Sequence, residues 1–386
     1  MSRKTTIETL GASGDGKVIG SADCYIPFTL PNEEILLGSD NELENIITPS
    51  PERITPPCEY FTKCGGCRLQ HMNIAYYQNW KKQSLIKTLN QKSINISIEE
   101  PIFIPAHTRR RAEFAFKENT LFGFYGLKSH KILNINHCQI LSPQLEELFS
   151  ILKNFPWKGQ GSMLVSLCYN GIDLFIKSSH RDINLEMREQ FAELIHKSSI
   201  TRITWNNELV LEKHPLHVSF EDKIISFPAG SFLQPSVEGE VTLQNLVKQE
   251  IPENAKVLDL FCGLGTFTVP LNATGFDSTK EAIKSLTKAG YQTHVRDLFK
   301  DPLTTKELAP YSHVVLDPPR AGAQEQIKSL SEAKTFEKII YVSCNPATFT
   351  RDARILVDSG YSLQKLTPVD QFIYSPYLEL VAVFMK

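Results

Sequence analysis

Cys344 stands where an apolar run, 338–343, gives way to Asn-Pro and then to residues that favour a helix. A thiol beside a helix N-terminus meets positive partial charge, which lowers its pKa and raises its thiolate fraction. This placement predicts a nucleophile. A buried, unreactive thiol is the alternative, and it is the commoner fate of a single cysteine.

Two carboxylates accompany apolar runs in the same part of the chain. Asp317 ends the run His313–Leu316, and the two prolines after it restrain the loop that leads to Arg320. Glu379 lies in the apolar run Leu378–Phe384, where burial would raise its pKa toward that of a general base. A turn without chemistry and an outward-facing strand residue are the alternatives for these two acids.

A glycine-containing turn follows the apolar strand expected at Lys256–Phe261. Gly263 and Gly265 let the backbone approach a ligand and leave amide groups free at the start of the next helix. The turn has two glycines and no following Lys-Ser or Lys-Thr, so it matches neither the dinucleotide fingerprint nor the phosphate-binding loop. With Asp259 before it, the turn looks like the S-adenosyl-L-methionine loop of Rossmann-like methyltransferases; an ordinary strand-turn-helix is the alternative.

Two further acids stand at the expected ends of later strands, where ligands bind in such sheets. Asp277 could accept the hydroxyl groups of a ribose, and Asp297 could meet an adenine amino group. Either acid could instead cap a surface helix.

Four cysteines have a spacing typical of a closed metal site. Cys58, Cys64 and Cys67 lie within ten residues, and Cys138 follows 71 positions later. Four thiolates suit tetrahedral zinc or a four-iron cluster. Zinc ribbons usually use two close cysteine pairs, so the three-plus-one arrangement favours the iron–sulfur cluster.

Basic side chains concentrate in one segment, although the net charge of the chain is −2. Residues 58–131 hold 12 Lys and Arg against 5 Asp and Glu. Three consecutive arginines near Phe114 and Phe116 predict phosphate binding and stacking on unpaired RNA bases. A strand with one solvated basic face is the alternative. The arginines are Arg109, Arg110 and Arg111.

The elements that must position these residues fall into three regions. Residues 1–50 carry short apolar stretches broken by Gly and Pro, which favours a small β-barrel. Residues 51–230 mix short strands with a helix expected at Ile74–Leu89. In residues 231–386, helical stretches alternate with β-rich runs, which predicts a doubly wound α/β sheet.

The composition is that of an ordinary globular protein, with 41% hydrophobic and 22% charged residues in 386. No run of about 18 apolar residues could span a bilayer, and the segment Met1–Leu10 lacks the apolar stretch of a signal peptide. Eight cysteines are too few for a disulfide scaffold. We therefore expect a cytoplasmic protein, a monomer without membrane contact.

In order and spacing, these motifs resemble the RNA uridine 5-methyltransferases that carry a four-iron cluster. The resemblance covers nearly the whole chain and also includes Phe232-Leu233-Gln234. It implies an N-terminal oligonucleotide-binding-like (TRAM-like) barrel, a central iron–sulfur domain and a Rossmann-like catalytic domain. It also implies S-adenosyl-L-methionine and a [4Fe-4S] cluster as cofactors and RNA as the partner.

The resemblance assigns a role to each site residue. Cys344 is the nucleophile that forms a covalent adduct with uracil, Glu379 is the base, and Asp317 lies at the cofactor and target-base site, where Arg320 offsets negative charge. The cluster ligands are Cys58, Cys64, Cys67 and Cys138. The cofactor contacts are Gln234, Phe261, Gly263, Gly265, Thr266, Asp277, Asp297 and Asp317.

Three functions are compatible with these residues. The barrel together with the cluster favours 23S ribosomal RNA as the substrate. The same chemistry on the tRNA T-loop is the alternative within the enzyme class. A catalytically silent iron–sulfur RNA-binding protein is the alternative from another class, and the presence of both Cys344 and Glu379 argues against it.

Overall fold

The N-terminal strands form an antiparallel sheet of their own. The computed structural model describes residues 2–118, 121–333 and 335–386. The sheet order is β3-β2-β1-β4-β5, and alternate apolar side chains such as Ile7 and Ile35 make its core. Its strands are β1 (Arg3–Leu10), β2 (Gly16–Val18), β3 (Tyr25–Ile26), β4 (Glu34–Leu37) and β5 (Leu43–Thr48). The β-rich prediction is confirmed; the described strands pair as an open sheet, and a closed barrel stays a prediction.

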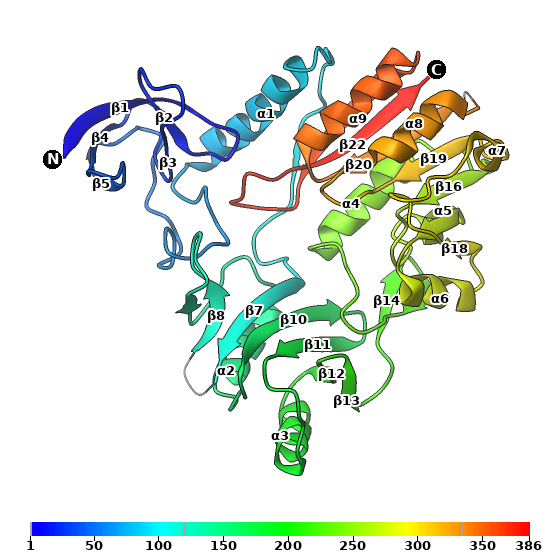
Figure 1. Cartoon of the computed structure of the whole chain (residues 1–386), viewed down its shortest axis with the longest axis horizontal. Coiled ribbons are helices and arrows are strands. Elements are labelled where there is room, and N and C mark those ends of the chain that lie inside the picture. The colour runs from blue at the N-terminus through cyan, green and yellow to red at the C-terminus, as the bar shows by residue number, and fades with distance from the viewer. Residues whose placement is uncertain (1, 119–120, 334) are drawn as a thin grey trace.

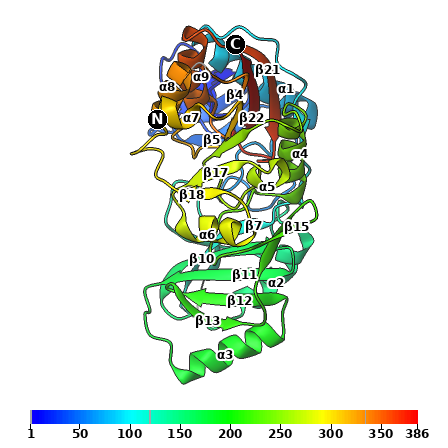
Figure 2. The same cartoon turned by 90° about the vertical axis from the view of Figure 1, so that its right-hand side faces the viewer.

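A seven-stranded sheet lies at the centre of the chain, in the order β13-β12-β11-β10-β7-β8-β9. Helices α2 (Pro143–Lys153) and α3 (Leu185–His196) pack on it, and Figure 2 shows this sheet and α3 at one end of the molecule. The strands are β7 (Arg111–Lys117), β8 (Leu121–Tyr125), β9 (Ile132–Asn134), β10 (Gln160–Cys168), β11 (Gly171–Ser178), β12 (Ile200–Trp205) and β13 (Glu208–Glu212).

The aromatic side chains of β7 belong to the core of this sheet. Phe114 packs against Phe122 and Phe149, with ring centroids 5.2 and 5.4 Å away, and Phe116 lies 5.2 Å from Trp157. Both phenylalanines are buried. The prediction that they stack on RNA bases is therefore wrong, because strand alternation turns both rings inward.

The C-terminal sheet has the order β18-β17-β16-β19-β20-β22-β21-β6. Its first five strands run parallel, and β22 runs antiparallel to both of its neighbours. The strands are β16 (Val257–Leu260), β17 (Thr274–Asp277), β18 (Thr293–Val295), β19 (His313–Leu316), β20 (Lys338–Ser343), β21 (Ser362–Asp370), β22 (Glu379–Met385) and β6 (Ile102–Phe103). A hairpin of β14 (His217–Phe220) and β15 (Lys223–Ser226) precedes the sheet.

Helices cover both faces of this sheet, as the alternating pattern predicts. One face packs under α1, α8 and α9, and the other under α4. Successive residues of β19 divide between the two cores: Val314 and Leu316 face one, and Val315 faces the other. The helices of the layer are α4 (Val237–Lys248), α5 (Thr268–Leu271), α6 (Lys280–Lys288), α7 (Thr305–Leu308), α8 (Gln324–Ala333) and α9 (Pro346–Asp358). This is the Rossmann-like α/β class.

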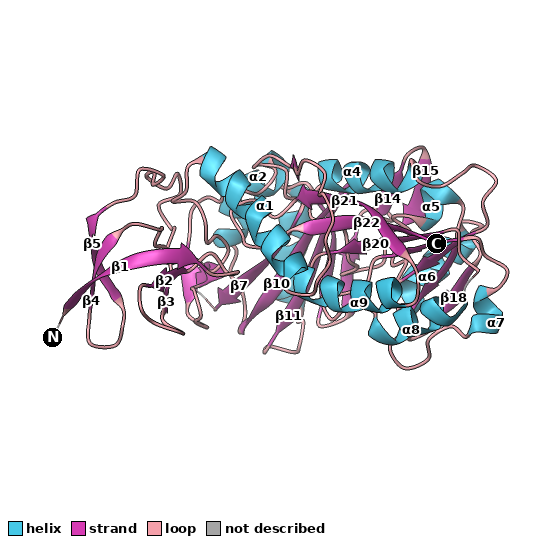
Figure 3. Cartoon of the chain, turned by 90° about the horizontal axis from the view of Figure 1, so that it is seen from above, coloured by secondary structure: helices cyan, strands magenta, loops and turns pink. Residues whose placement is uncertain are grey.

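One segment from before the central sheet lies with the C-terminal layer. Helix α1 (Ile74–Asn90) runs beside α9, and its Leu85 and Leu89 are buried in the core of that layer (Figure 1). Strand β6 pairs with β21 as the last strand of the sheet. In Figure 3, α1 spans the distance between the N-terminal sheet and the C-terminal helices. From the sequence, this segment is predicted to belong to the region 51–230. Its tertiary partners lie more than 200 positions further along the chain, so local pattern could not reveal them.

Candidate active site

The predicted catalytic residues meet at one edge of the C-terminal sheet. Asp317 follows β19 and Cys344 follows β20, and these two strands pair in parallel, so both chains leave the sheet at the same edge. Strand β22 runs the other way and begins with Glu379. Its first residue therefore lies at the edge where the parallel strands end.

A chain of side-chain hydrogen bonds joins the two acids. Gln234 Nε2 donates to Asp317 Oδ2 at 3.1 Å. Gln371 Nε2 donates to Gln234 Oε1 at 3.0 Å and to Glu379 Oε1 at 3.2 Å. The sequence analysis missed Gln371. Gln371 directly follows β21, whose end pairs with the start of β22, and only this pairing brings it beside Glu379, so no sequence signal marked it.

Burial is the largest influence on both acids. It raises the pKa of Glu379, and the nearby charge of Asp317 raises it further, while Gln371 and Arg320 oppose the shift. Burial likewise raises the pKa of Asp317, against the hydrogen bond from Gln234. Among the described residues, Glu379 Oε2 is buried without a hydrogen-bond partner. That oxygen is the one free to take a proton.

The pKa of Cys344 differs from the sequence prediction. Burial raises it to about 11, the charges of Glu379 and Asp317 add to the shift, and Arg320 opposes it. The predicted lowering by the helix N-terminus is therefore wrong for the free protein. The physical reason is that burial and the two nearby carboxylates outweigh the helix end, where Asn345 Oδ1 accepts the hydrogen bond of the Ala347 N–H at 3.1 Å.

Arg320 is held at the mouth of this site. Its guanidinium carbon lies 3.9 Å from the ring centroid of Tyr377. Its backbone oxygen accepts hydrogen bonds from Asn345 Nδ2 at 2.9 Å and Thr348 Oγ1 at 3.1 Å. The loop after β19 is thus tied to the start of α9, and the positive charge stays near Cys344.

The glycine turn after β16 has the backbone that the sequence predicts. Gly263 and Gly265 have φ of 52° and 94°, and a Cβ on Gly265 would stand 2.6 Å from Leu286. The Gly263 N–H donates to Asp277 Oδ2 at 3.1 Å. The turn and the acid after β17 therefore lie against each other.

Two more predicted cofactor residues border the same turn. Asp297 accepts the Phe299 N–H at 3.1 Å, and the ring of Phe299 lies 5.3 Å from that of Phe261. The oxygen of Thr266 accepts a hydrogen bond from Gln244 at 2.9 Å. All the predicted cofactor residues thus border the edge that carries Asp317.

A buried acid in β16 precedes the turn. Asp259 Oδ2 accepts a hydrogen bond from Thr268 Oγ1 at 2.6 Å, and burial raises the pKa of Asp259 to about 8. The acid of the glycine motif is therefore enclosed in the sheet.

The four predicted metal ligands line one cleft of about 730 Å³. Arg109, Arg320 and Tyr377 border the same cleft, so it reaches from the cysteines to the catalytic loops. The cysteines are unpaired and lie in loops outside helices and strands, with Cys64 at an isolated β-bridge to Gly126. Within residues 2–118, 121–333 and 335–386, no group of three or more His, Cys, Asp or Glu is placed to hold a single metal ion. The four ligands are Cys58, Cys64, Cys67 and Cys138.

The cysteine segment is bonded to the loop that precedes Glu379. The N–H groups of Arg68 and Leu69, directly after Cys67, donate to the oxygen of Tyr374 at 2.7 and 3.0 Å. A buried ion pair lies behind this contact. Lys81 Nζ is 2.7 Å from Asp370 Oδ1 and also donates to the oxygen of Tyr377.

The three arginines have three different surroundings. Arg110 is buried, with Nη2 2.8 Å from Glu240 Oε1 and Nε donating to the oxygen of Gln234. The prediction that Arg110 binds RNA is therefore wrong, because its charge is used inside the protein. Arg109 borders the cysteine cleft, and Arg111 lies 5.2 Å from the exposed ring of Phe232.

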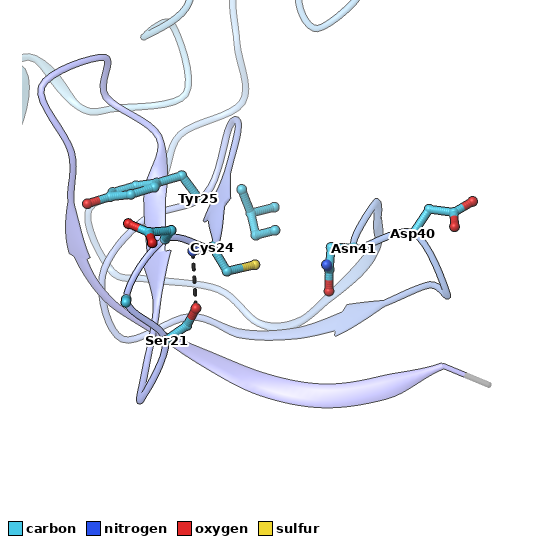
Figure 4. A pocket seen from close by; sticks show the side chains of 8 residues that line it. Ser21, Cys24, Tyr25, Asp40 and Asn41 are labelled. Atoms are coloured by element: carbon cyan, nitrogen blue, oxygen red, sulfur yellow. Dashed lines mark hydrogen bonds between the residues drawn. The ribbon is translucent and has the colours of Figure 1, made fainter.

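An open hollow also lies in the N-terminal sheet (Figure 4). Cys24, Tyr25, Asp40 and Asn41 line it, and Ser21 Oγ accepts the Cys24 N–H at 3.1 Å. The hollow contains none of the predicted site residues.

The Rossmann-like fold and the residues at the edge of its sheet indicate a methyltransferase, and comparison with known proteins agrees. The family described as tRNA (uracil-5-)-methyltransferase matches residues 146–297 and 284–386. An uncharacterized RNA methyltransferase of Brucella melitensis is 35% identical over 99% of this chain and 97% of its own length. The chain therefore belongs to the tRNA (uracil-5-)-methyltransferase family, and it is an RNA uracil-5-methyltransferase.

Two more relatives have more detailed names. The 23S rRNA (uracil(1939)-C(5))-methyltransferase of Histophilus somni is 27% identical over 99% of this chain and 95% of its own length. The tRNA (uracil-54, C5)-methyltransferase of Pyrococcus abyssi, solved with S-adenosyl-L-homocysteine, has a TM-score of 0.77 at 22% identity. It covers 99% of this chain and 100% of its own, which shows a shared fold. No helix among the described residues of this chain is long and apolar enough to cross a membrane.

Proposed function

We propose that this enzyme methylates carbon 5 of a uridine in 23S ribosomal RNA through a covalent adduct with Cys344. The observation that carries the proposal is the meeting of a thiol, a buried base and a donor-linked acid at one edge of the sheet. Carbon 5 of uracil is too weak a nucleophile to take a methyl group unaided, so a nucleophilic residue such as the thiol must first add to the ring.

The Cys344 thiolate adds to carbon 6 of the target uracil, and the ring becomes an enolate that is nucleophilic at carbon 5. S-Adenosyl-L-methionine supplies the methyl group that carbon 5 takes up. Glu379 Oε2 then accepts the carbon 5 proton. The electron pair of that C–H bond forms the carbon 5–carbon 6 double bond and expels the thiolate.

The neighbouring groups support this sequence of steps. Arg320 lies near enough to lower the pKa of Cys344 and of Glu379 against their burial, and it can offset enolate charge. Asp317 and Gln234, which are joined by a hydrogen bond, would hold the base edge and the cofactor. Because the pKa of the Cys344 thiol is raised in the free protein, the bound uridine and Arg320 must lower that pKa for the thiolate to form.

The cofactor would lie along the turn after β16. Phe261, Gly263, Gly265 and Thr266 would contact it from the turn, and Asp277 and Asp297 from the next strands. The Gly263 N–H is already held by Asp277, so the turn is organised before the cofactor arrives.

The four cysteines are proposed to hold a [4Fe-4S] cluster. Two observations support the fit: all four line one cleft, and all four are unpaired thiols. A four-iron cluster is wider than a single ion, so its thiolates need to surround a volume instead of converging on a point. Arg109 at the cleft wall would face the negative charge of such a cluster.

Ribosomal RNA is proposed over transfer RNA because the Histophilus somni relative named for 23S rRNA is 27% identical over 99% of this chain. The Pyrococcus abyssi tRNA enzyme, at 22% identity, supports the shared fold alone. The test is a map of 5-methyluridine in both RNAs from cells with and without the gene. Loss of one 23S rRNA methyl group is expected. Loss at the T-loop would replace this target with tRNA, and no loss in either RNA would favour the catalytically silent alternative.

The adduct is tested with Glu379→Gln, which keeps the shape of the side chain but removes the base. Addition and methyl transfer should proceed while elimination stops, so methylated RNA stays linked to the protein in denaturing electrophoresis. The link should disappear when Cys344→Ala is added. Normal turnover by Glu379→Gln would reject Glu379 as the base.

A further inference from the structure

We infer that Gln371 is a positioning residue for this reaction: it orients Glu379 and favours the ionised form of that acid, which takes the carbon 5 proton. The inference rests on the proposed function, because it takes Glu379 to be the base. Gln371 was absent from the motifs found in the sequence, and its position follows from the tertiary structure alone.

The hydrogen bonds of Gln371 have a direction. An amide nitrogen offers two donors, and the two bonds of Nε2 go to Gln234 Oε1 at 3.0 Å and Glu379 Oε1 at 3.2 Å. Gln234 in turn donates to Asp317 Oδ2. Donors therefore point outward from Gln371 toward both acids, which is the arrangement that favours carboxylates over carboxylic acids.

Burial makes these bonds matter. Gln371, Gln234 and Glu379 are 6%, 4% and 5% exposed. In such surroundings water cannot replace a lost donor, and an unpaired carboxylate would take up a proton. The bond from Gln371 opposes the rise that burial causes in the pKa of Glu379.

The bond to Oε1 also selects the reacting oxygen. With Oε1 held by Gln371, Oε2 is the oxygen of Glu379 without a partner among the described residues. The proton from carbon 5 would therefore go to Oε2, and Oε1 would keep its donor throughout. Rotation of the carboxyl group is restrained while the base works.

A glycine of α4 makes room for the amide. A Cβ on Gly239 would stand 2.5 Å from Gln371 Oε1 and 2.8 Å from Ser236 Oγ. Glycine inside a helix is less favourable than alanine, so the position keeps a residue that weakens the helix and admits Gln371. This observation is independent of the hydrogen bonds.

The test compares Gln371→Met with Gln326→Met in steady-state methylation across about pH 6 to 9. Methionine matches glutamine in size but has no amide. For Gln371→Met we expect kcat to fall about tenfold at neutral pH, the value of one lost bond to a charged group, with the KM for RNA and cofactor within about twofold. The acidic limb of the kcat profile should move to higher pH, so raising the pH should restore activity. RNA-linked protein should accumulate during turnover.

The control glutamine is equally buried but lies away from the site. Gln326 is 1% exposed, and its amide bonds the backbone of Leu303. Gln326→Met should lose stability without a shift of the pH profile. An unshifted acidic limb in Gln371→Met, or a rise in KM at constant kcat, would overturn the inference.

A second variant keeps the inference testable if Gln371→Met does not fold. Gly239→Ala should push the amide of Gln371 aside and reproduce the pH shift, although alanine favours the helix; a normal profile in the folded variant would overturn the inference. The Glu379→Gln variant distinguishes a failure of the inference about Gln371 from a failure of the proposed function. If it traps the adduct while both other variants behave as wild type, only the role of Gln371 falls, and if it turns over normally, the proposed function falls as well.

Discussion

Cys344 and the four cysteines of the cleft differ in what holds them in place. Cys344 lies at the joint of a central strand and a capped helix, and the acids near it are joined by hydrogen bonds from Gln371 and Gln234. The four cleft cysteines lie in loops of two segments, three of them within ten residues and Cys138 71 positions further on. The catalytic edge is therefore organised by the sheet, whereas the cleft depends on a few loop contacts and on whatever fills it.

The two regions are nevertheless joined. Arg68 and Leu69, next to the cysteine segment, bond to Tyr374, and Lys81 bonds to Asp370 and Tyr377. The loop so held leads from Gln371 to Glu379. A defect in the cleft should therefore reach the active site through this loop, whereas a defect at Cys344 should leave the cleft intact.

Cys344→Ala should have the largest effect on activity. Without the thiolate no enolate forms, so methyl transfer should fall at least about a thousandfold. RNA affinity, iron content and thermal stability should match the wild type. Methyl transfer from labelled cofactor and iron analysis provide the measurements, and loss of iron in this variant would break the separation of the two regions.

Cys138→Ser should have the opposite pattern. Anaerobically purified protein should carry about four irons and four labile sulfides, and the variant should lose them. Because the proposed cluster would link segments 71 positions apart, its loss should lower thermal stability by several degrees and weaken RNA binding. Cys24→Ser, in the N-terminal hollow, should keep its iron. Stoichiometric zinc without iron in the wild type would reject the cluster.

Lys81→Met tests the contact that ties the cysteine segment to the loop before Glu379. It leaves Asp370 buried without its cation, which should cost about 3–5 kcal/mol of unfolding free energy. The neighbouring Lys82 pairs with the exposed Glu100 at 2.6 Å, and Lys82→Met should cost about 0–1 kcal/mol. Urea unfolding measures both variants. Equal effects would show that the buried pair does not hold the loop.

Arg111→Ala should have the smallest effect, visible in RNA binding alone. Loss of one phosphate contact should reduce the slope of log affinity against log salt by about 0.7–0.9. Arg110→Ala should leave that slope unchanged and lower stability instead, since Glu240 loses its partner. A reduced slope in Arg110→Ala would mean that the arginine reaches RNA after all.

Local pattern predicted several elements of the C-terminal layer. The runs His313–Leu316 and Lys338–Ser343 are β19 and β20 with the same bounds, and the helix expected at Ile74–Leu89 ends one residue later. These features depend on periodicity and on proline and glycine, which act over a few residues. Arg110 pairs with Glu240 and Gln371 bonds to Gln234, and both partners lie more than 100 positions away in the chain. The bond from Gln371 to Glu379 depends on the pairing of β21 with β22. No local pattern contains these contacts.

The sequence by itself determined the Rossmann-like alternation, the catalytic residue types and the three-plus-one spacing of cysteines, because each is written in the order of the chain. Only the tertiary structure decided how their electrostatics combine. Burial beside two acids raises the pKa of Cys344 although it stands before a helix, and strand alternation turns Phe114 and Phe116 into the core. Charge and burial are set by neighbours in space, and those neighbours exist only once the sheets have assembled.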